Sequence, residues 1–364
     1  MSSEYVETIV VGAGQAGLAV GYHLRKNHMT FLIVDGNARV GDGWRRQWDS
    51  LRLFSPAGHD ALPGRRFPAT KWSYPSKDEV ADYLESYAAT FDLPIRLNSR
   101  VDSVAERADG YLVTIGTRQI EAHNVVIATG GMGRTPYIPE FADRLDPRIL
   151  QLHSSEYRRP QQLRPGPVLV VGASHSGCDI AYELAPSRPT TLCGHDCGQI
   201  PVRLDSPTIR LVFPVVAFVQ GHVLTRRTPV GRRIKAHVRD HGAPMLRVKR
   251  RDLLDRGVDR NTARVTDVRD GLPVLEDGTS VAAENVLWCT GFRQSFDWIA
   301  PAVLDDDGWP VETRGVTASP GLYFNGLSFQ RAFSSMLIDG AGRDAAYVVK
   351  QIRHRTSEHA TVGT

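Results

Sequence analysis

Two stretches of the chain share one pattern of apolar residues, glycines and helix-forming residues. In the first, residues 7–14 (ETIVVGAG) form a continuous β-branched run that ends in glycines, and residues 16–26 (AGLAVGYHLRK) have the character of a helix packed on a sheet. The second, residues 167–185 (PVLVVGASHSGCDIAYELA), repeats this order. The repeat predicts an α/β fold with two Rossmann-like dinucleotide-binding domains.

Each glycine of the first copy has its own expected task. Gly12 allows the tight turn, Gly14 lets a pyrophosphate approach the backbone, and Gly17 lets helix and strand pack closely. The next apolar run, TFLIVD, ends at Asp35, where an acid can accept hydrogen bonds from a ribose diol. The spacing favours dinucleotide binding at a helix N-terminus. The alternative is a glycine-rich turn with a structural role alone.

The second copy departs from the first at two points. Ser174 stands between Gly172 and Gly177 in the middle glycine place, and the following run TTLCG (190–194) leads into His195 and Asp196. Two nucleotide sites call for two nucleotides, and electron transfer between a nicotinamide and a flavin is the simplest chemistry that uses both.

Length and composition fit a globular protein of roughly two domains. The 364 residues include no apolar stretch long enough to span a membrane, and the first ten residues lack the pattern of a signal peptide. The expectation is a soluble, cytoplasmic protein without a membrane span. Four cysteines are too few and too scattered for a disulfide scaffold or a metal site, and Cys193-x-x-x-Cys197 is one residue longer than a redox C-x-x-C motif.

Positive charge is concentrated between Arg203 and Arg260, where 14 Lys or Arg face 5 Asp or Glu. The plainest interpretation is a solvated helical surface. A basic rim that attracts an anionic cofactor or substrate is the functional alternative. Nucleic acid is not an expected partner, because no binding motif accompanies the charge.

With these motifs in place, the sequence resembles the class B flavoprotein monooxygenases, which include flavin-containing, YUCCA-type and Baeyer-Villiger monooxygenases. The resemblance implies that the first copy binds FAD and the second binds the nicotinamide. It also implies that residues 125–131 (VVIATGG) and 286–292 (VLWCTGF) cross between domains, with hinges at 129–133 and 290–292. The nicotinamide domain, 159–285, is then inserted into an FAD domain made of 1–158 and 286–364.

The resemblance and the glycine motifs together give a set of expected cofactor-binding residues, while no catalytic side chain or metal ligand is identified. Gly43 and Trp44, followed by SLRLFSPA (50–57), resemble the segment alongside the flavin, although Trp44 also fits an ordinary core aromatic. Gln330 and Arg331 are candidates to face the ring or to cap a helix. The full set is Gly12, Ala13, Gly14, Gln15, Ala16, Gly17, Asp35, Gly36, Gly43, Trp44, Val101, Thr129, Gly130, Gly172, Ala173, Ser174, His175, Ser176, Gly177, Thr290, Gly291 and Gln330.

One family signature is retained only in part. Flavin-containing monooxygenases carry Phe-x-Gly-x-x-x-His-x-x-x-Tyr or Phe, whereas Baeyer-Villiger enzymes end the motif in Trp. Here His153 and Tyr157 match, but Pro147 and Ile149 stand in the Phe and Gly places. Tyr157 argues against the Baeyer-Villiger branch. His153 is either a hydrogen-bonded structural residue at the hinge or a direct participant.

The implied chemistry is hydride transfer from NADPH to FAD, addition of O2 to form a flavin hydroperoxide, and transfer of one oxygen atom to a small molecule. NADH is an alternative to NADPH, because His195 and Asp196 follow TTLCG where the family often has an arginine. Arg203 or an arginine of 226–233 is a candidate substitute.

Three other functions remain open from the sequence. They are a flavin reductase without oxygen insertion, a disulfide reductase, and a non-catalytic nucleotide sensor that binds a partner through its basic segment. The substrate and the oligomeric state are not readable, and a homodimer is left open.

Overall fold

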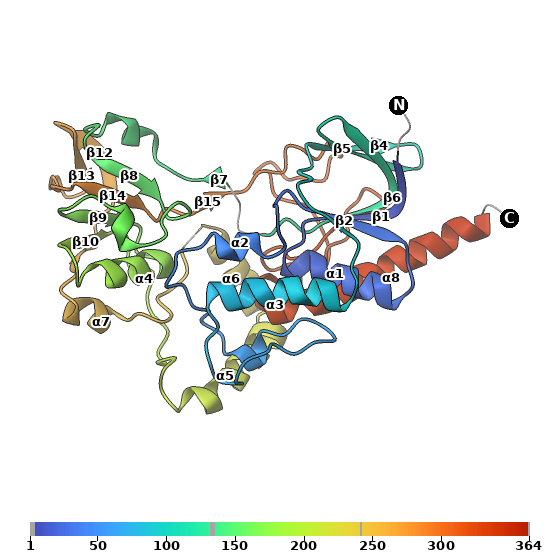
Figure 1. The fold of residues 1–364 in the computed structure, drawn as a ribbon, viewed down its shortest axis with the longest axis horizontal. Helices are drawn as coiled ribbons and strands as arrows, with labels where there is room; N and C mark the ends of the chain where they lie inside the picture. Colours follow the sequence, from blue (N-terminus) through green and yellow to red (C-terminus); the bar gives the residue numbers. More distant parts are fainter. Residues whose placement is uncertain (1–3, 132–134, 241, 363–364) are drawn as a thin grey trace.

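The computed structural model describes residues 4–131, 135–240 and 242–362. The chain forms two lobes, each built around a β-sheet, and a short two-stranded ribbon lies between them (Figure 1). Both sheets contain parallel strands covered by helices, so the predicted α/β fold with two Rossmann-like units is confirmed.

The first sheet has the strand order β3-β2-β1-β6-β5-β4, and β16 pairs with β6. Its strands are β1 (Glu4–Val11), β2 (Phe31–Val34), β3 (Ile95–Arg96), β4 (Ser103–Arg107), β5 (Gly110–Ile115), β6 (Arg118–Ile127) and β16 (Leu322–Phe324). Strands β4 and β5 form an antiparallel meander with β6, while the other pairs are parallel. The apolar run that predicted a buried strand is β1, whose Ile9 and Val10 are fully buried.

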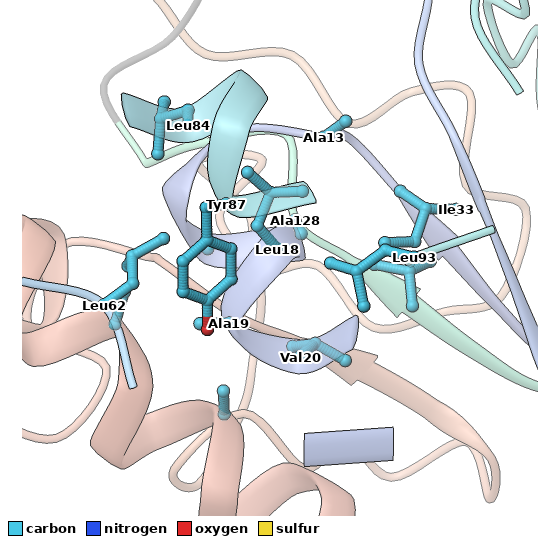
Figure 2. Packing of buried hydrophobic residues seen from close by; sticks show 14 of the residues in the cluster. Ala13, Leu18, Ala19, Val20, Ile33, Leu62, Leu84, Tyr87, Leu93 and Ala128 are labelled. Atoms are coloured by element: carbon cyan, nitrogen blue, oxygen red, sulfur yellow. The ribbon is translucent and has the colours of Figure 1, made fainter. Parts of the chain in front are cut away.

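Helices from both ends of the chain pack on this sheet. They are α1 (Gln15–Lys26), α3 (Lys77–Thr90) and α8 (Ile338–Val362). Figure 2 shows Leu18 and Val20 of α1 in the core with Ile33 and Leu93. A Cβ at Gly21 would lie 2.8 Å from Cδ1 of Ile33, so α1 approaches β2 closely. Burial of these side chains fixes α1 on the sheet, with its N-terminus just after the end of the interior strand β1.

The second sheet is parallel throughout, in the order β11-β10-β9-β14-β8. Its strands are β8 (Leu150–His153), β9 (Val168–Val171), β10 (Thr190–Cys193), β11 (Asp259–Asn261) and β14 (Asn285–Trp288). The same lobe contains α4 (His175–Leu184), α7 (Arg250–Asp255) and the hairpin of β12 (Val265–Arg269) with β13 (Leu272–Leu275). Every residue of β9 and β14 is buried, as expected for central strands of a covered parallel sheet.

The chain crosses between the lobes twice, through β7 (Thr135–Pro136) and β15 (Phe292–Arg293), which pair antiparallel. The second lobe is therefore inserted between parts of the first. Its sheet includes β8, which precedes residue 159, and β14, which extends past residue 285. Residues 132–133 of the expected hinge lie outside the described residues.

A helical segment of the inserted part reaches the first lobe. It contains α5 (Ile209–Phe218) and α6 (Pro229–Asp240), joined through a π-helical turn at Val219–Val223. Ile209 and Phe213 of α5 belong to a small apolar cluster with Phe54, Trp72 and Tyr74 of the first lobe. A bridge between Thr225 and Ala332 adds a second contact. The lobes are thus joined by side-chain packing as well as by the ribbon.

Candidate dinucleotide-binding site

The first glycine turn joins β1 to α1 in a backbone conformation that requires two of its glycines. Gly12 has a φ of 110°, and a Cβ there would lie 2.7 Å from the carbonyl oxygen of Ala128. A Cβ at Gly17 would overlap the carbonyl oxygen of Gly12. The tasks expected of Gly12 and Gly17, a tight turn and close helix–strand packing, therefore have a direct structural basis.

Gly14 differs, because apart from its neighbours in the chain and the helix backbone no atom of the described residues lies within 4 Å of a Cβ built on it. Gly14 is the N-cap of α1. The first turn of this helix has no acidic residue, and no side chain caps its N-terminus. The amides after Gly14, including those of Gln15 and Ala16, are consequently available to an anion, and the helix dipole favours one there. This turn fits the pyrophosphate of a dinucleotide.

Asp35 follows β2 and lies beside the first glycine turn. The amide of Ala13 donates to Oδ2 at 2.6 Å, and the amide of Asn37 donates to Oδ1 at 2.8 Å. A carboxylate oxygen can accept more than one hydrogen bond, so Asp35 keeps capacity for a diol. The segment 99–101 runs alongside: Ser99 donates its amide to the carbonyl of Asp35 at 2.8 Å, and Val101 packs against the sheet. Gly36 lies against Arg100, since a Cβ there would be 3.2 Å from Cβ of Arg100.

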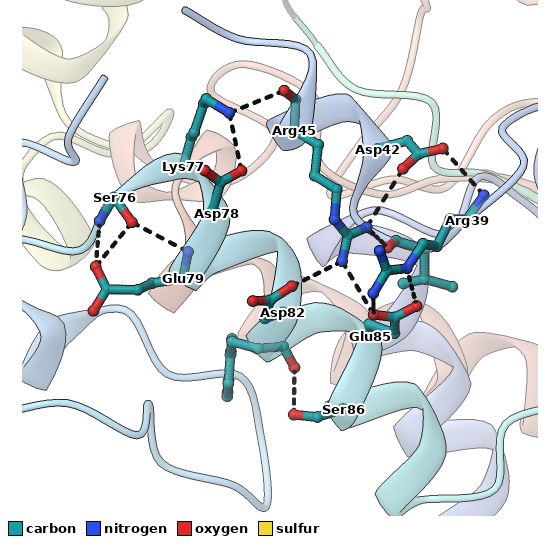
Figure 3. Close-up of polar contacts among 12 residues, drawn as sticks. Arg39, Asp42, Arg45, Ser76, Lys77, Asp78, Glu79, Asp82, Glu85 and Ser86 are labelled. Carbon is teal, nitrogen blue, oxygen red and sulfur yellow. Dashed lines mark hydrogen bonds and ion pairs between the residues drawn. The ribbon is translucent and has the colours of Figure 1, made fainter. Parts of the chain in front are cut away.

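Trp44 lies next to Gln15, with its indole Nε1 3.4 Å from Oε1 of Gln15. It belongs to the short helix α2 (Asp42–Arg45), which follows a left-handed turn at Gly41. Figure 3 shows how Arg45 ties this helix to α3, with Nη2 3.0 Å from Asp82 and 3.1 Å from Glu85. Gly43 has open space at its Cβ position. The expected Gly43 and Trp44 are thus fixed beside the first glycine turn.

The second glycine turn repeats the backbone of the first. Gly172 has a φ of 106°, and a Cβ there would overlap the carbonyl oxygen of Cys289. A Cβ at Gly177 would overlap the carbonyl oxygen of Gly172. Ala173 is buried under the turn, and Ser174 is the N-cap of α4, again without a side-chain cap or an acid in the first turn.

A loop of the inserted lobe contacts this second turn. Ser174 donates its Oγ to the carbonyl of Ala243 at 2.9 Å, and a Cβ at Gly242 would lie 2.9 Å from Cβ of Ser174. His175 and Ser176 follow, both half-buried. Burial lowers the pKa of His175 below its usual value, so the ring is neutral near pH 7.

The two glycine turns each lie against the strand that leads out of their sheet. Gly12 meets Ala128, which precedes Thr129 and Gly130, and Gly172 meets Cys289, which precedes Thr290 and Gly291. Both Gly130 and Gly291 have positive φ, 97° and 82°, so the chain bends sharply at each. Thr290 donates its hydroxyl to the carbonyl of Tyr137, while Gln294 donates to the carbonyl of Gly130 at 3.1 Å. The Thr-Gly pairs therefore mark the points where the chain turns into the ribbon.

His153 is fully buried behind this crossing. The amide of Ser155 donates to Nδ1 at 3.1 Å, so Nε2 carries the proton and donates to the carbonyl of Gly291 at 3.0 Å. Burial lowers the pKa of His153. Both ring nitrogens are thus engaged by neighbouring chain atoms, which agrees with the structural alternative for His153. Tyr157, also fully buried, donates to Glu183 at 2.7 Å.

Two basic residues that sequence reasoning missed, one in α7 and one in β11, contact the loop after β10. Asp196 pairs with Arg250 at 2.7 Å, and Arg260 donates to the carbonyl of Gly194 at 2.6 Å. By contrast, Arg203 pairs with Asp205 and Asp252. Because Arg250 is 54 residues from Asp196, no local pattern could have indicated the pair.

Gln330 is fully buried on a loop of the first lobe. Its Oε1 accepts from the amide of Leu327 at 3.3 Å, whereas its Nε2 has no hydrogen-bond partner among the described residues. Arg226 of the inserted segment pairs with the buried carboxylate of Glu312 and donates to the carbonyl of Gln330 at 3.2 Å. Arg226 is thereby committed to the contact between lobes, and it is not a free phosphate clamp.

The cysteines form no disulfide: Cys178, Cys193, Cys197 and Cys289 are all free. Burial raises the pKa of the Cys193 thiol to about 12, so it carries almost no thiolate at neutral pH. Nothing in this environment favours a redox role for Cys193 with Cys197.

Comparison with known proteins defines the class. The fold is shared with a flavin-containing monooxygenase from Stenotrophomonas maltophilia, at 27% identity and a TM-score of 0.75 over 97% of this chain and 99% of that one. OTEMO, crystallised in complex with FAD and NADP, shares the fold at 16% identity, with a TM-score of 0.69 over 98% of this chain and 87% of that one. The chain is also 28% identical to indole-3-pyruvate monooxygenase YUCCA8 of Oryza sativa, over 96% of this chain and 91% of that protein. The resemblance to class B flavoprotein monooxygenases is confirmed. The expected pair of cofactors, FAD and a nicotinamide dinucleotide, agrees with these relatives.

The family itself follows from a match to residues 9–192 by the model described as pyridine nucleotide-disulphide oxidoreductase. The chain is 38% identical to an uncharacterized CzcO-like oxidoreductase of Geobacillus kaustophilus, over 95% of this chain and 98% of that protein. This protein therefore belongs to the pyridine nucleotide-disulphide oxidoreductase family.

Proposed function

We propose that this protein is an FAD-dependent NAD(P)H oxidoreductase and, within that class, a monooxygenase that inserts one oxygen atom from O2 into a small molecule. The observation that carries the proposal is the repeated glycine turn. Gly12 with Gly17 and Gly172 with Gly177 have the same packing, each beside a Thr-Gly turn into the ribbon. Two such turns in one chain call for two dinucleotides.

The first turn is the proposed FAD site. The amides after Gly14 would hold the pyrophosphate, and Asp35 would accept hydrogen bonds from the ribose. Trp44 and Gln330 remain proposed neighbours of the ring. When bound, FAD supplies a ring that accepts hydride from NAD(P)H and, once reduced, reacts with O2. The other residues of the expected set are proposed as cofactor contacts because they belong to the glycine turns, to the Thr-Gly turns or to the segments beside them.

The second turn is the proposed nicotinamide site, with NADPH the preferred form. Arg250 and Arg260 bring positive charge to the loop after β10, and Arg250 neutralises Asp196, which would otherwise repel a 2′-phosphate. His153 would position the ribbon by holding Gly291, without transferring a proton itself. The ratio of kcat/KM for NADPH and NADH tests this preference, and a tenfold advantage for NADH would overturn it.

Oxygen insertion is tested by rapid mixing. The FAD-loaded protein is reduced with NADPH without oxygen and then mixed with oxygenated buffer while its flavin absorbance is followed. A further absorbing species that persists before the oxidised spectrum returns supports the monooxygenase and justifies a screen of amines, sulfides and carbonyl compounds. Candidate products are then examined for one labelled atom from ¹⁸O2.

A flavin reductase without oxygen insertion is the second candidate, favoured by one observation. Ile149, in the place of the family's Gly, is buried in the core of the second lobe. If the Phe and Gly places of the signature are needed for oxygen insertion, the rapid-mixing experiment should show the oxidised flavin spectrum returning directly, with release of hydrogen peroxide. If the protein oxidised neither NADPH nor NADH under any condition, the non-catalytic nucleotide sensor would become the better explanation.

A cytoplasmic location is also proposed. It is supported by the four free cysteines, since disulfides form mainly in oxidising compartments. Detection of the protein in the cytoplasmic fraction of its own cells tests it.

A further inference from the structure

One helix of the inserted lobe exposes a row of large apolar side chains. In α5, Ile209 and Phe213 face the apolar cluster that joins the lobes, while Leu211, Val215 and Phe218 are 80%, 61% and 57% exposed. Their spacing of four and three residues places them along one stripe of the helix. Figure 1 shows α5 at the lower margin of the molecule, away from both sheets. The helix is therefore two-faced, with its outer face in water.

The segment that carries this stripe is also rich in positive charge. Residues 206–235 contain six Lys or Arg and no Asp or Glu. Arg210, Arg227, Arg232 and Arg233 are exposed, and none of them forms an ion pair within the described part of the chain. Val230, at the start of α6, is exposed as well. An exposed apolar stripe in a cationic segment is the combination that binds an anionic lipid surface.

We propose that α5 and the basic residues around it dock this protein onto an anionic phospholipid bilayer, with the apolar stripe of Leu211, Val215 and Phe218 in the interface. The helix would lie in the plane of the surface. None of the helices in the described ranges is long and apolar enough to cross a bilayer. This inference goes beyond the oxidoreductase function and does not depend on it.

The positive charge of this segment favours a bilayer over a second copy of the chain as the partner of α5. A symmetric dimer through α5 would bring the same cationic segments together, and like charges across an interface oppose association. An anionic bilayer complements those charges. It also accepts Leu211, Val215 and Phe218 without requiring a matching protein surface.

Vesicle co-sedimentation of the full-length, FAD-loaded protein tests the proposal. We expect binding to phosphatidylcholine vesicles that contain phosphatidylglycerol, little binding to phosphatidylcholine alone, and loss of binding as salt is raised. The variant Leu211→Ser/Val215→Ser should weaken binding about tenfold, because two apolar side chains no longer enter the interface.

The chain offers a matched control. Leu254 and Val311 are 70% and 56% exposed at other places, so Leu254→Ser/Val311→Ser makes the same chemical change away from α5. For charge, Arg232→Gln/Arg233→Gln is compared with Arg66→Gln/Arg118→Gln, which are also exposed. The first of these pairs should weaken binding about tenfold and the second should not.

Three results would overturn the proposal. One is the absence of binding to anionic vesicles. A second is equal binding by the α5 variants and their controls, with unchanged unfolding temperatures. The third is concentration-dependent dimerisation, lost in the α5 variant, without vesicle binding. Because NADPH oxidation is measured on the same samples, loss of docking and loss of the oxidoreductase function can be told apart.

Discussion

The two glycine turns have the same backbone but different surroundings. At the first, Gly14 faces open space and the carboxylate of Asp35 accepts from the amide of Ala13. At the second, Ser174 is bonded to the carbonyl of Ala243, and the acid after the following strand, Asp196, is paired with Arg250. The shared glycines set the turn, and we infer that the side chains around it decide which dinucleotide each turn takes.

The largest effects are expected where both turns need a glycine. Gly17→Ala places a Cβ on the carbonyl of Gly12, and Gly177→Ala places one on the carbonyl of Gly172. We predict that Gly17→Ala abolishes FAD retention, while Gly177→Ala keeps FAD but loses its reduction by NADPH. The ratio of flavin to protein absorbance and anaerobic NADPH titrations measure the two outcomes. Retention of FAD by Gly17→Ala would break the assignment of the first turn.

The next effect separates binding from folding. Since nothing surrounds a Cβ at Gly14, Gly14→Val should leave the unfolding temperature of the apoprotein almost unchanged while FAD affinity falls by at least about tenfold. The comparison variant, Ser174→Val, should keep full FAD content. Equal FAD loss in both variants would mean that the turns do not have separate ligands.

A smaller effect is expected from the acids beside each turn. A hydrogen bond to a charged group contributes about 1.5 to 3 kcal/mol, so Asp35→Asn should weaken FAD binding roughly 10- to 100-fold. Asp196→Asn removes a carboxylate and releases Arg250, so it should raise the preference for NADPH over NADH about tenfold without changing FAD content. Fluorescence titration with FAD and the two kcat/KM values check these results. A shift toward NADH in Asp196→Asn would contradict the placement of the 2′-phosphate.

The smallest effect concerns His153 at the crossing. Burial lowers its pKa in the folded protein below the usual 6.5, so the unfolded chain binds more protons once the pH falls below that value. The contribution of His153 is complete above pH 6.5 and declines as the pH drops toward the folded pKa. The expected slope is at most about 1.4 kcal/mol per pH unit; it should be missing from the stability curve of His153→Gln and therefore appear in the difference between the two curves. Denaturant unfolding from pH 5 to 8 measures it, and identical slopes in both proteins would contradict the burial of His153.

The similarity of the two glycine turns could be predicted from the sequence, because a turn of this kind is determined by residues close together in the chain. Gly12, Gly17, Gly172 and Gly177 follow buried strands at fixed spacing, and the turn they form depends on a few neighbouring residues. Thr290-Gly291 was expected from the resemblance to class B flavoprotein monooxygenases, at the end of a buried apolar run.

The surroundings of the turns depend on contacts that are distant in sequence. Ser174 meets Ala243 across 69 residues and Asp196 meets Arg250 across 54, so periodicity and motif spacing carry no information about either pair. The exposure of Leu211 and Val215 was hidden too, because an apolar helix has the same pattern whether its outer face is covered or not.

The most direct test of the account is anaerobic addition of NADPH to the purified, FAD-loaded protein. If the two turns hold the two dinucleotides, the flavin absorbance band is bleached with one equivalent of NADPH, and oxygen restores it. A protein that retains no flavin, or whose bound flavin is not reduced by either NADPH or NADH, would contradict the account.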